Sequence, residues 1–421
     1  MAGFDGEKYL RLLGERWVRK GGAARRRPHS PVLPAAAAAL VAVDAITIAA
    51  AQAVVDDYDL SRGQGHHDPV SEMTGRPAAP AAPAAPSAPG IGEVRVVPCE
   101  RVIDQPGARL TFHYVAFTSH ATTIRADLRL AEPPPRQPRP DPLPAWARQL
   151  SVTDSHGTTA AAVFSGSGRI GGTVFRGQFE TDPRLAADTA WIELLGERIE
   201  LAAPPAVTET WAEPLPEQDP AVRHVWERVA TLNDFHDPHL AFEATAAALV
   251  AAGALPAGAP VLADARAALA VLRPRNPADA APAPPPRDLA GPWPSLLARW
   301  GRIGGQVRTI AVGAVTPPFD GVTAAVIALE SRAEHVGVSV ELVPGVRTGL
   351  PYADLPDQGH LTWWAADDLG NYYLGEQGSW NPGAGRSWGT ILFWPALDQR
   401  ASRIDLMPTA AATRAVIRVP L

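Results

Sequence analysis

An internal repeat limits the folds that this chain can adopt more than any other feature of its sequence. The tripeptide PRL at 183–185, followed by IEL at 192–194, recurs as PAL at 395–397, followed by IDL at 404–406. The intervals are identical and the offset is 212 throughout. A repeated unit is expected to fold in the same way twice, so the repeat predicts two units of similar fold.

Two further pairs of segments recur in the same order. The segment DSHG at 154–157 matches DDLG at 367–370, and both lie between β-like runs. This spacing predicts a tight turn in which Asp accepts hydrogen bonds from the turn backbone and Gly adopts a positive φ. An Ala-rich helical run around Leu40 also matches one around Leu249. Together the three pairs predict a tandem duplication.

Each predicted copy consists of a helical region, a Pro/Ala spacer and a β domain. The spacers contain PAAPAAPAAPSAP at 77–89 and PRNPADAAPAPPPR at 274–287, where Pro at this density favours extended polyproline II backbone. We interpret them as semi-rigid spacers, with a ligand for a proline-recognition module as the alternative. The expected order is helical region 1–70, spacer 71–91, β domain 92–203, connector 204–217, helical region 218–272, spacer 273–292 and β domain 293–421.

The β domains show the alternation of half-buried antiparallel strands. Ile124, Ala126, Leu128 and Leu130 alternate with polar residues, as expected when one face of a sheet is buried. About seven such short strands per domain predict an immunoglobulin-like sandwich, although the Cys and Trp signature of true immunoglobulin domains is absent. The predicted fold class is therefore α+β multidomain, with two immunoglobulin-like antiparallel β-sandwiches, each preceded by a small helical region.

The helical regions are too small to bury much surface alone. Their apolar residues form helical stripes, Tyr9, Leu10, Leu13 and Trp17 in the first copy and Val222, Val225, Trp226 and Val229 in the second. We therefore expect these regions to pack on each other, on a sandwich, or on a partner.

At the D-x-x-G and P-x-L…I-E/D-L motifs, the chain resembles uncharacterised proteins of high-GC actinobacteria with duplicated sandwich-like domains. The Ala-, Pro- and Arg-rich, Lys-poor composition agrees with that resemblance. The resemblance implies a duplicated β architecture. It implies no activity, cofactor or site residue.

The charge and the cysteine content exclude some classes of function. The formal net charge is -6, whereas nucleic-acid-binding domains carry a basic footprint, so we expect no nucleic-acid partner. The single cysteine, Cys99, forms no intramolecular disulfide and lies in a strand-like run. We interpret it as a small buried apolar residue rather than a nucleophile, because no partner base lies nearby in the sequence.

One apolar stretch, 34–55, follows three arginines and has the pattern of a signal peptide. Asp44 interrupts it, and a similar pattern recurs at 240–270, in the middle of the chain. We therefore predict a folded helix there. The Ala-rich run is not apolar enough for a membrane span. The expected location is cytoplasmic.

Three motifs suggest chemistry but lack its structural context. The segment GSGRIG at 166–171 matches the dinucleotide fingerprint, yet a strand-like run follows it where a helix is needed. Asp154, Ser155 and His156 are triad residue types, but adjacent residues have the wrong geometry for a triad. The histidine groups at 66–67 and 236–239 carry no recognised zinc spacing. We therefore predict no catalytic residue, no cofactor and no metal site.

The aromatic residues of the last domain are the candidate ligand-binding residues. Consecutive strand residues point to opposite faces, so one residue of each pair Trp363-Trp364 and Tyr372-Tyr373 must face away from its own core. Exposed Trp beside Asn and Gly stacks on sugars or anchors a partner. The candidates are Trp363, Tyr373, Trp380 and Trp388. The alternative is that the helical regions or the other sandwich cover this face.

Three functions follow from these observations. The first is a non-enzymatic protein-interaction or scaffold protein with an unidentified protein partner, because paired domains present two linked binding surfaces. The second is a small-ligand or carbohydrate-binding module that uses the Trp-rich domain. The third is an enzyme with an unrecognised site between the domains, which no sequence feature favours.

Overall fold

The computed structural model describes most of the chain, and the descriptions below concern those residues only. They are 4–20, 32–58, 91–92, 94–132, 143–168, 173–201, 208–231, 238–272, 293–302, 304, 308–344, 361–383, 386–410 and 412–421. The two Pro/Ala segments at 77–89 and 274–287, the arginine run at 25–27 and the histidines at 66–67 and 236 lie outside these residues.

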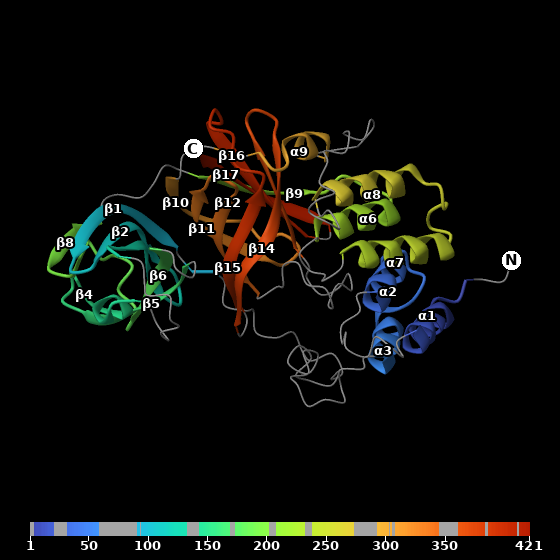
Figure 1. Ribbon diagram of the computed structural model, residues 1–421, viewed down its shortest axis with the longest axis horizontal. Helices are drawn as coiled ribbons and strands as arrows, with labels where there is room; N and C mark the ends of the chain where they lie inside the picture. Colours follow the sequence, from blue (N-terminus) through green and yellow to red (C-terminus); the bar gives the residue numbers. More distant parts are fainter. Residues whose placement is uncertain are drawn as a thin grey trace.

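The helices of the two predicted helical regions pack into one bundle (Figure 1). The first region contains α1 (Gly6–Lys20), α2 (Val32–Ala42) and α3 (Ile48–Tyr58), and the second contains α6 (Pro220–Ala230), α7 (Pro238–Ala251) and α8 (Pro260–Leu272). The Ala-rich helices α2 and α7 lie at the centre and contact each other. Small side chains permit this close packing, and the Thr245 hydroxyl donates to the Ala35 carbonyl oxygen at 3.4 Å.

The first β domain is one continuous antiparallel sheet with the order β1-β2-β3-β6-β5-β4-β7-β8. A short helix, α5 (Ala145–Arg148), precedes β4. Strand β3 buries every second residue, so the alternation in its sequence corresponds to a core face and an outer face. The strands are β1 (Arg95–Gln105), β2 (Ala108–Phe117), β3 (Thr122–Leu130), β4 (Gln149–Asp154), β5 (Thr159–Gly168), β6 (Val174–Asp182), β7 (Trp191–Leu194) and β8 (Glu197–Glu200).

The second β domain is a nine-stranded sheet with the order β10-β11-β12-β15-β14-β13-β16-β17-β9. Helix α9 (Trp293–Arg299) precedes it, and the ninth strand, β9 (Glu209–Pro214), comes from the stretch expected to be a connector. The other strands are β10 (Arg308–Val315), β11 (Thr323–Ser331), β12 (Val336–Val343), β13 (Thr362–Asp367), β14 (Tyr372–Gly383), β15 (Arg386–Trp394), β16 (Arg403–Thr409) and β17 (Thr413–Pro420).

Each sheet curves until its ends approach, which gives two nearly barrel-like domains. In the first sheet β1 contacts β8, and in the second β9 lies between β17 and β10. An immunoglobulin-like sandwich is two separate sheets packed face to face. That finer expectation is not confirmed, because hydrogen bonds join all strands of each domain in one sheet. The two domains are called barrel A (β1–β8) and barrel B (β9–β17) below.

Strands β1 to β8 of barrel A and strands β10 to β17 of barrel B follow the same spatial order. Irregularities of pairing also match. The bulge in β2 at His113 corresponds to one in β11 at Ile327, and bulges interrupt β1 after Pro98 and β10 after Ala311. A bulge depends on local sequence and geometry. The shared pattern supports the predicted duplication, which remains a prediction.

The two predicted D-x-x-G turns have the same geometry. Oδ1 of Asp154 accepts from the backbone N–H of the residues two and four positions later, at 2.9 and 2.8 Å. Oδ1 of Asp367 does the same at 3.0 and 2.9 Å. Gly157 and Gly370 have φ of 80° and 79°, where a Cβ would be strained. The residues Asp154, Ser155 and His156 therefore form a turn.

Corresponding strands of the two barrels face each other across an apolar seam. Val96, Tyr114 and Ala116 of barrel A pack with Ala325 and Ala328 of barrel B, among other residues. Strand β10 approaches β1 closely at a glycine, Gly313, whose φ is 62°. Barrel B also contacts the helical bundle, so it occupies the middle of the molecule (Figure 1).

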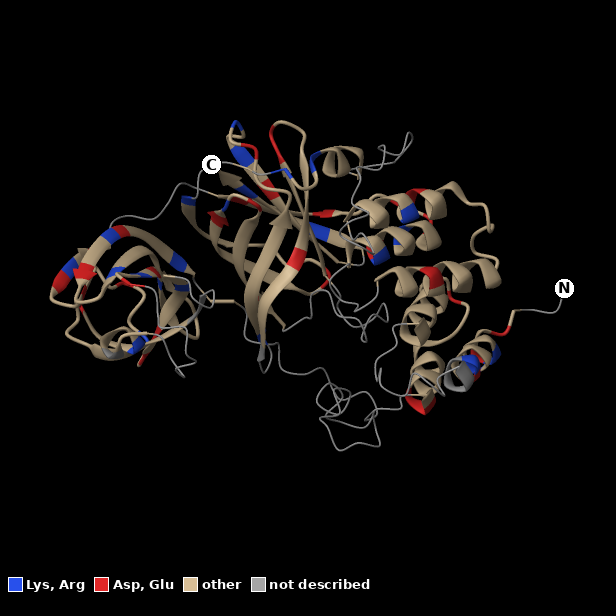
Figure 2. Ribbon diagram, viewed as in Figure 1, with Lys and Arg blue, Asp and Glu red and all other residues tan. Residues whose placement is uncertain are grey.

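Acidic and basic residues are interspersed over all three parts of the molecule (Figure 2). Within the part of the chain that the structure describes, every helix is too short or too polar to cross a membrane.

Candidate functional site

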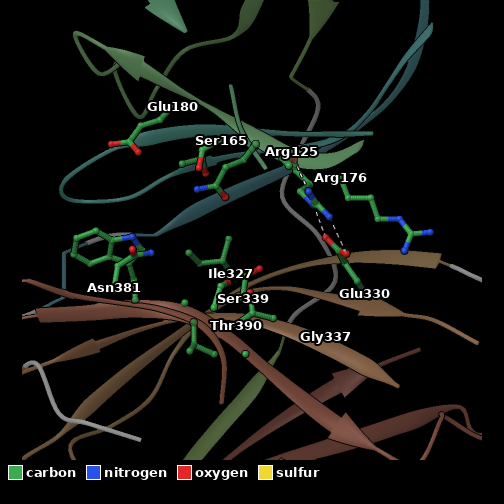
Figure 3. A pocket seen from close by; sticks show the side chains of 18 of the residues that line it. Arg125, Ser165, Arg176, Glu180, Ile327, Glu330, Gly337, Ser339, Asn381 and Thr390 are labelled. Carbon is green, nitrogen blue, oxygen red and sulfur yellow. Dashed lines mark hydrogen bonds and ion pairs between the residues drawn. The ribbon is translucent and has the colours of Figure 1, made fainter. Parts of the chain in front are cut away.

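A cleft of about 1110 Å³ lies between the two barrels (Figure 3). Its walls are the outer faces of β3, β5 and β6 in barrel A and of β12, β14 and β15 in barrel B. A pocket of this size is large enough for a drug-sized ligand. The cleft borders the apolar seam, because Tyr114 of β2 and Ile327 of β11 belong to the seam and also line the cleft.

Small residues of barrel B keep the cleft open. Gly337, Ser339 and Thr390 lie along one wall (Figure 3). A Cβ added at Gly337 would make only ordinary contacts, at 3.7 Å from the Thr390 side chain. A side chain could therefore be present at position 337 without a steric clash. The space beside Gly337 is open because this residue has no side chain.

A buried ion pair between the barrels lies at the edge of the cleft. Nε of Arg125 on β3 donates to Oε1 of Glu330 on β11, and its Nη2 donates to Oε2 at 3.1 Å. Only 11% of the Arg125 side chain and 14% of the Glu330 side chain are exposed. Arg125 also donates to the Gly177 carbonyl oxygen, and Arg332 donates to Glu330. Such a bidentate arrangement fixes both partners.

The pKa of Glu330 reflects these contacts. Burial alone would raise it, but the hydrogen bonds and charges of Arg125 and Arg332 outweigh burial and lower the pKa to about 2. Burial raises the pKa of the neighbouring Tyr114 phenol to about 12, although a hydrogen bond with Ser339 opposes the shift. Both side chains therefore keep their usual charge near neutral pH.

An aromatic and polar cluster lies elsewhere along the cleft. The His120 ring lies 5.5 Å from the Trp388 ring, and its Nδ1 lies 3.3 Å from Oε2 of the fully buried Glu341. Arg386 donates to the other oxygen of Glu341 at 3.3 Å. The contact between His120 and Oε2 of Glu341 lacks the geometry of a hydrogen bond. Within the described residues, this oxygen has no hydrogen-bond partner. Asn381 pairs with Trp388 across β14 and β15 and is exposed.

The structure separates the four aromatic residues that the sequence singled out. Trp363 and Tyr373 lie inside barrel B, with 2% and 0% of their surface exposed. Trp380 is half-buried, and its ring lies against Gly389 of β15. Trp388 lines the cleft. Among the four, Trp388 is the residue placed where a cleft-bound ligand would meet it.

The helical bundle covers part of the aromatic surface of barrel B. The rings of Trp364 and Trp293 of α9 are 5.2 Å apart, and Trp293 stacks on Trp226 of α6 at 4.8 Å. Tyr372 packs on the same bundle core. For Trp364 and Tyr372 the alternative weighed from the sequence, coverage by the helical regions, is what the structure shows.

The remaining sequence candidates have structural positions. Cys99 is buried in β1, and burial raises the pKa of its thiol to about 12. A strand, β6, follows the glycine segment at 166–171, where a dinucleotide fingerprint needs a helix. Among the described residues no group of three or more potential metal ligands occurs.

The most informative cleft residues, Arg125, Glu330 and Arg176, were not singled out from the sequence. Arg125 was visible as an outward residue in the alternating strand that contains Ile124 and Ala126. The alternation predicts only that Arg125 faces away from its own core. It carries no information about the second barrel that covers this face.

Comparisons with known proteins give little further information. The chain matches no protein-family model and no curated protein. It is similar to the solved structure described as the crystal structure of the conserved domain protein from Bacillus anthracis, with 10% sequence identity and a TM-score of 0.19. That similarity covers 76% of this chain and 78% of the other. At such a TM-score it carries no functional argument.

Proposed function

We propose that the chain is a non-enzymatic binding protein that holds a small polar ligand in the cleft between its barrels. The observation that carries the proposal is the cleft itself, about 1110 Å³, lined by side chains from both barrels. Pockets that bind small molecules combine such a volume with an aromatic surface and a few polar groups. Trp388 supplies the aromatic surface, and Asn381, Gln178 and Thr123 supply polar groups.

This proposal modifies the carbohydrate-binding alternative drawn from the sequence. That alternative used the C-terminal domain alone, with Trp363, Tyr373, Trp380 and Trp388. In the proposal the site is shared, because strands from both barrels form its walls. A ligand bound there would bridge the barrels and stabilise their arrangement, since a ligand that binds only the folded form raises its stability.

A thermal-shift screen tests the proposal. The probes are sugars, nucleotides and amino acids, each applied at millimolar concentration to the full chain. Thr390→Trp places a large ring on the cleft wall, and Thr159→Trp adds the same ring at an exposed position on β5 outside the cleft. We expect a probe that raises the melting temperature of wild type and Thr159→Trp but not of Thr390→Trp. No probe with this pattern, or turnover of a probe, would contradict the proposal.

A protein-interaction or scaffold role is a second proposal. It is supported by the shared strand order of the barrels, which presents two related surfaces in one chain. Pull-down with wild type and Thr390→Trp separates the two proposals. A partner bound equally by both variants uses another surface, and a partner lost in Thr390→Trp uses the cleft.

A further inference from the structure

The matching strand orders allow the two walls of the cleft to be compared residue by residue. Thr122 and Val336 open β3 and β12 and pair with the last residues of β2 and β11. Counting along the registers gives Arg125 of β3 and Ser339 of β12 equivalent positions. Ile124 and Val338 are equivalent by the same count. Ile124 pairs with Phe179 of β6 and Val338 pairs with Ile391 of β15, so Phe179 and Ile391 are equivalent positions.

By this correspondence Arg176 occupies in barrel A the position that Trp388 occupies in barrel B. Both residues line the cleft. Corresponding strands face each other across the seam, so these two positions lie toward opposite ends of the cleft. Figure 3 shows Arg176 beside the Arg125–Glu330 pair, and Asn381, the strand partner of Trp388, on the other side. The two ends have the same topology and different chemistry.

The end at Arg176 is cationic. Three arginines line it, Arg125, Arg176 and Arg332, against the lining carboxylate of Glu330 and the adjacent carboxylate of Asp127. Glu330 accepts hydrogen bonds from both Arg125 and Arg332. Arg176 is 43% exposed, and its nearest carboxylate oxygen, on Asp127, is 3.8 Å away. Its guanidinium therefore retains donors for an oxyanion, the group that a guanidinium binds in a bidentate manner.

The end at Trp388 is suited to a sugar ring. The indole stands beside His120, and Asn381 lies next to it in the sheet. Gln178 and Glu180 line the cleft from barrel A. An aromatic face packs against the C–H face of a sugar, and amide and carboxylate groups hydrogen-bond its hydroxyls.

We infer that the ligand of the cleft is an acidic saccharide, a sugar that carries a carboxylate or a phosphate group. Its ring lies at Trp388 and its anionic group lies at Arg176 and Arg332. This inference rests on the proposed function, since it names the ligand class for the same cleft. The inference depends on the chemical difference between the two ends of the cleft. A neutral sugar would find suitable partners only at the Trp388 end, and a free anion only at the Arg176 end.

The test is isothermal titration of the full chain with four probes: maltose, its 6′-carboxylate, its 6′-phosphate and inorganic phosphate. We expect both acidic disaccharides to bind about tenfold or more tighter than maltose, because a charged hydrogen bond is stronger than a neutral one. The carboxylate and phosphate forms distinguish the two anion sources. Inorganic phosphate should bind more weakly than either, since it lacks the ring.

Two variants test which part of the ligand binds at each end of the cleft, and each has a matched control outside the cleft. Arg176→Gln should abolish the preference for the acidic forms and leave the maltose affinity unchanged, whereas Arg198→Gln, on the exposed β8, should change neither. Trp388→Ala should weaken all three disaccharides about tenfold or more, whereas Trp191→Ala, beside Arg198, should not. Circular dichroism of each variant checks that it folds.

Each of the following outcomes would overturn the inference. Equal affinity for maltose and its acidic forms, or an acidic preference that survives in Arg176→Gln, removes the cationic end from the site. If maltose binds and Thr390→Trp abolishes this binding without any acidic preference, the inference falls and the proposed function stands. If no saccharide binds in a manner sensitive to Thr390→Trp, the inference falls, and the thermal-shift screen decides the proposed function separately.

Discussion

Replacing Arg125 by alanine leaves Glu330 buried between the barrels with Arg332 as its remaining cationic partner. Contacts with the two arginines lower the pKa of Glu330 from its ordinary 4.5 to about 2, despite burial. At about 1.4 kcal/mol per tenfold change, that difference, the net effect of burial and of both arginines, corresponds to about 3 kcal/mol. Removing one partner of a buried pair costs about 3–5 kcal/mol. We therefore expect Arg125→Ala to lower the free energy of unfolding by about 3 kcal/mol.

Urea unfolding followed by tryptophan fluorescence measures this loss. Arg198→Ala is the control, because its ion pair with Glu200 is more than half exposed on both sides and such pairs contribute at most about 1 kcal/mol. The double variant Arg125→Met, Glu330→Leu should recover most of the stability, because apolar residues replace a buried pair at little cost. A loss below about 1 kcal/mol in Arg125→Ala, or a double variant less stable than Arg125→Ala, would refute the reasoning.

Four other predictions follow from single contacts. Because the pKa of Glu330 is lowered in the folded state, its stabilisation is complete above pH 4.5 and should disappear as the pH falls toward 2, which urea midpoints across this range in wild type and Glu330→Gln will show. Gly375→Ala places a Cβ 2.9 Å from a carbonyl oxygen of β13 and should cost about 1–3 kcal/mol by urea unfolding. Asp367→Ala removes the acceptor of the Tyr373 hydroxyl, 2.6 Å away, and of two turn N–H groups; we expect a loss of about 2–3 kcal/mol in a denaturation curve. Cys99 is buried and burial raises its thiol pKa to about 12, so a thiol reagent should label it only in urea, and labelling of the native chain at pH 8 would contradict its position.

The sequence predicted local structure well because local structure depends on local patterns. The alternation at Ile124 and Ala126 gave the strand β3, and the D-x-x-G spacing gave the turns at Asp154 and Asp367. The joining of strands into one continuous sheet depends on pairings between distant residues. Strand β9 shows the limit, because its short polar segment ETWAEP has no apolar alternation and is ordered by pairing with β17.

The same distinction explains the candidate site. The sequence established that one of Trp363 and Trp364 faces away from its own core, but period two assigns no direction to either residue. In the structure Trp363 points into barrel B, and Trp364 meets Trp293 of the helical bundle. Trp388 lines a cleft because barrel A lies over this part of barrel B. Its ring neighbour there, His120, is more than 200 positions away in the sequence. A pattern within one strand contains no information about such a neighbour.

The two ends of the cleft differ at a few positions that correspond in the two barrels. The positions equivalent to Arg125 and Glu330 hold Ser339 and Ala116, so the ion pair forms on one side of the seam and has no counterpart on the other. Arg176 and Trp388 differ in the same way. Two identical barrels related by a two-fold axis would present the same chemistry at both ends of the cleft. Under the proposed duplication, both copies belong to one chain, so the residues at each end of the cleft could change independently. A ligand with a ring at one end and an anion at the other requires such a difference between the two ends.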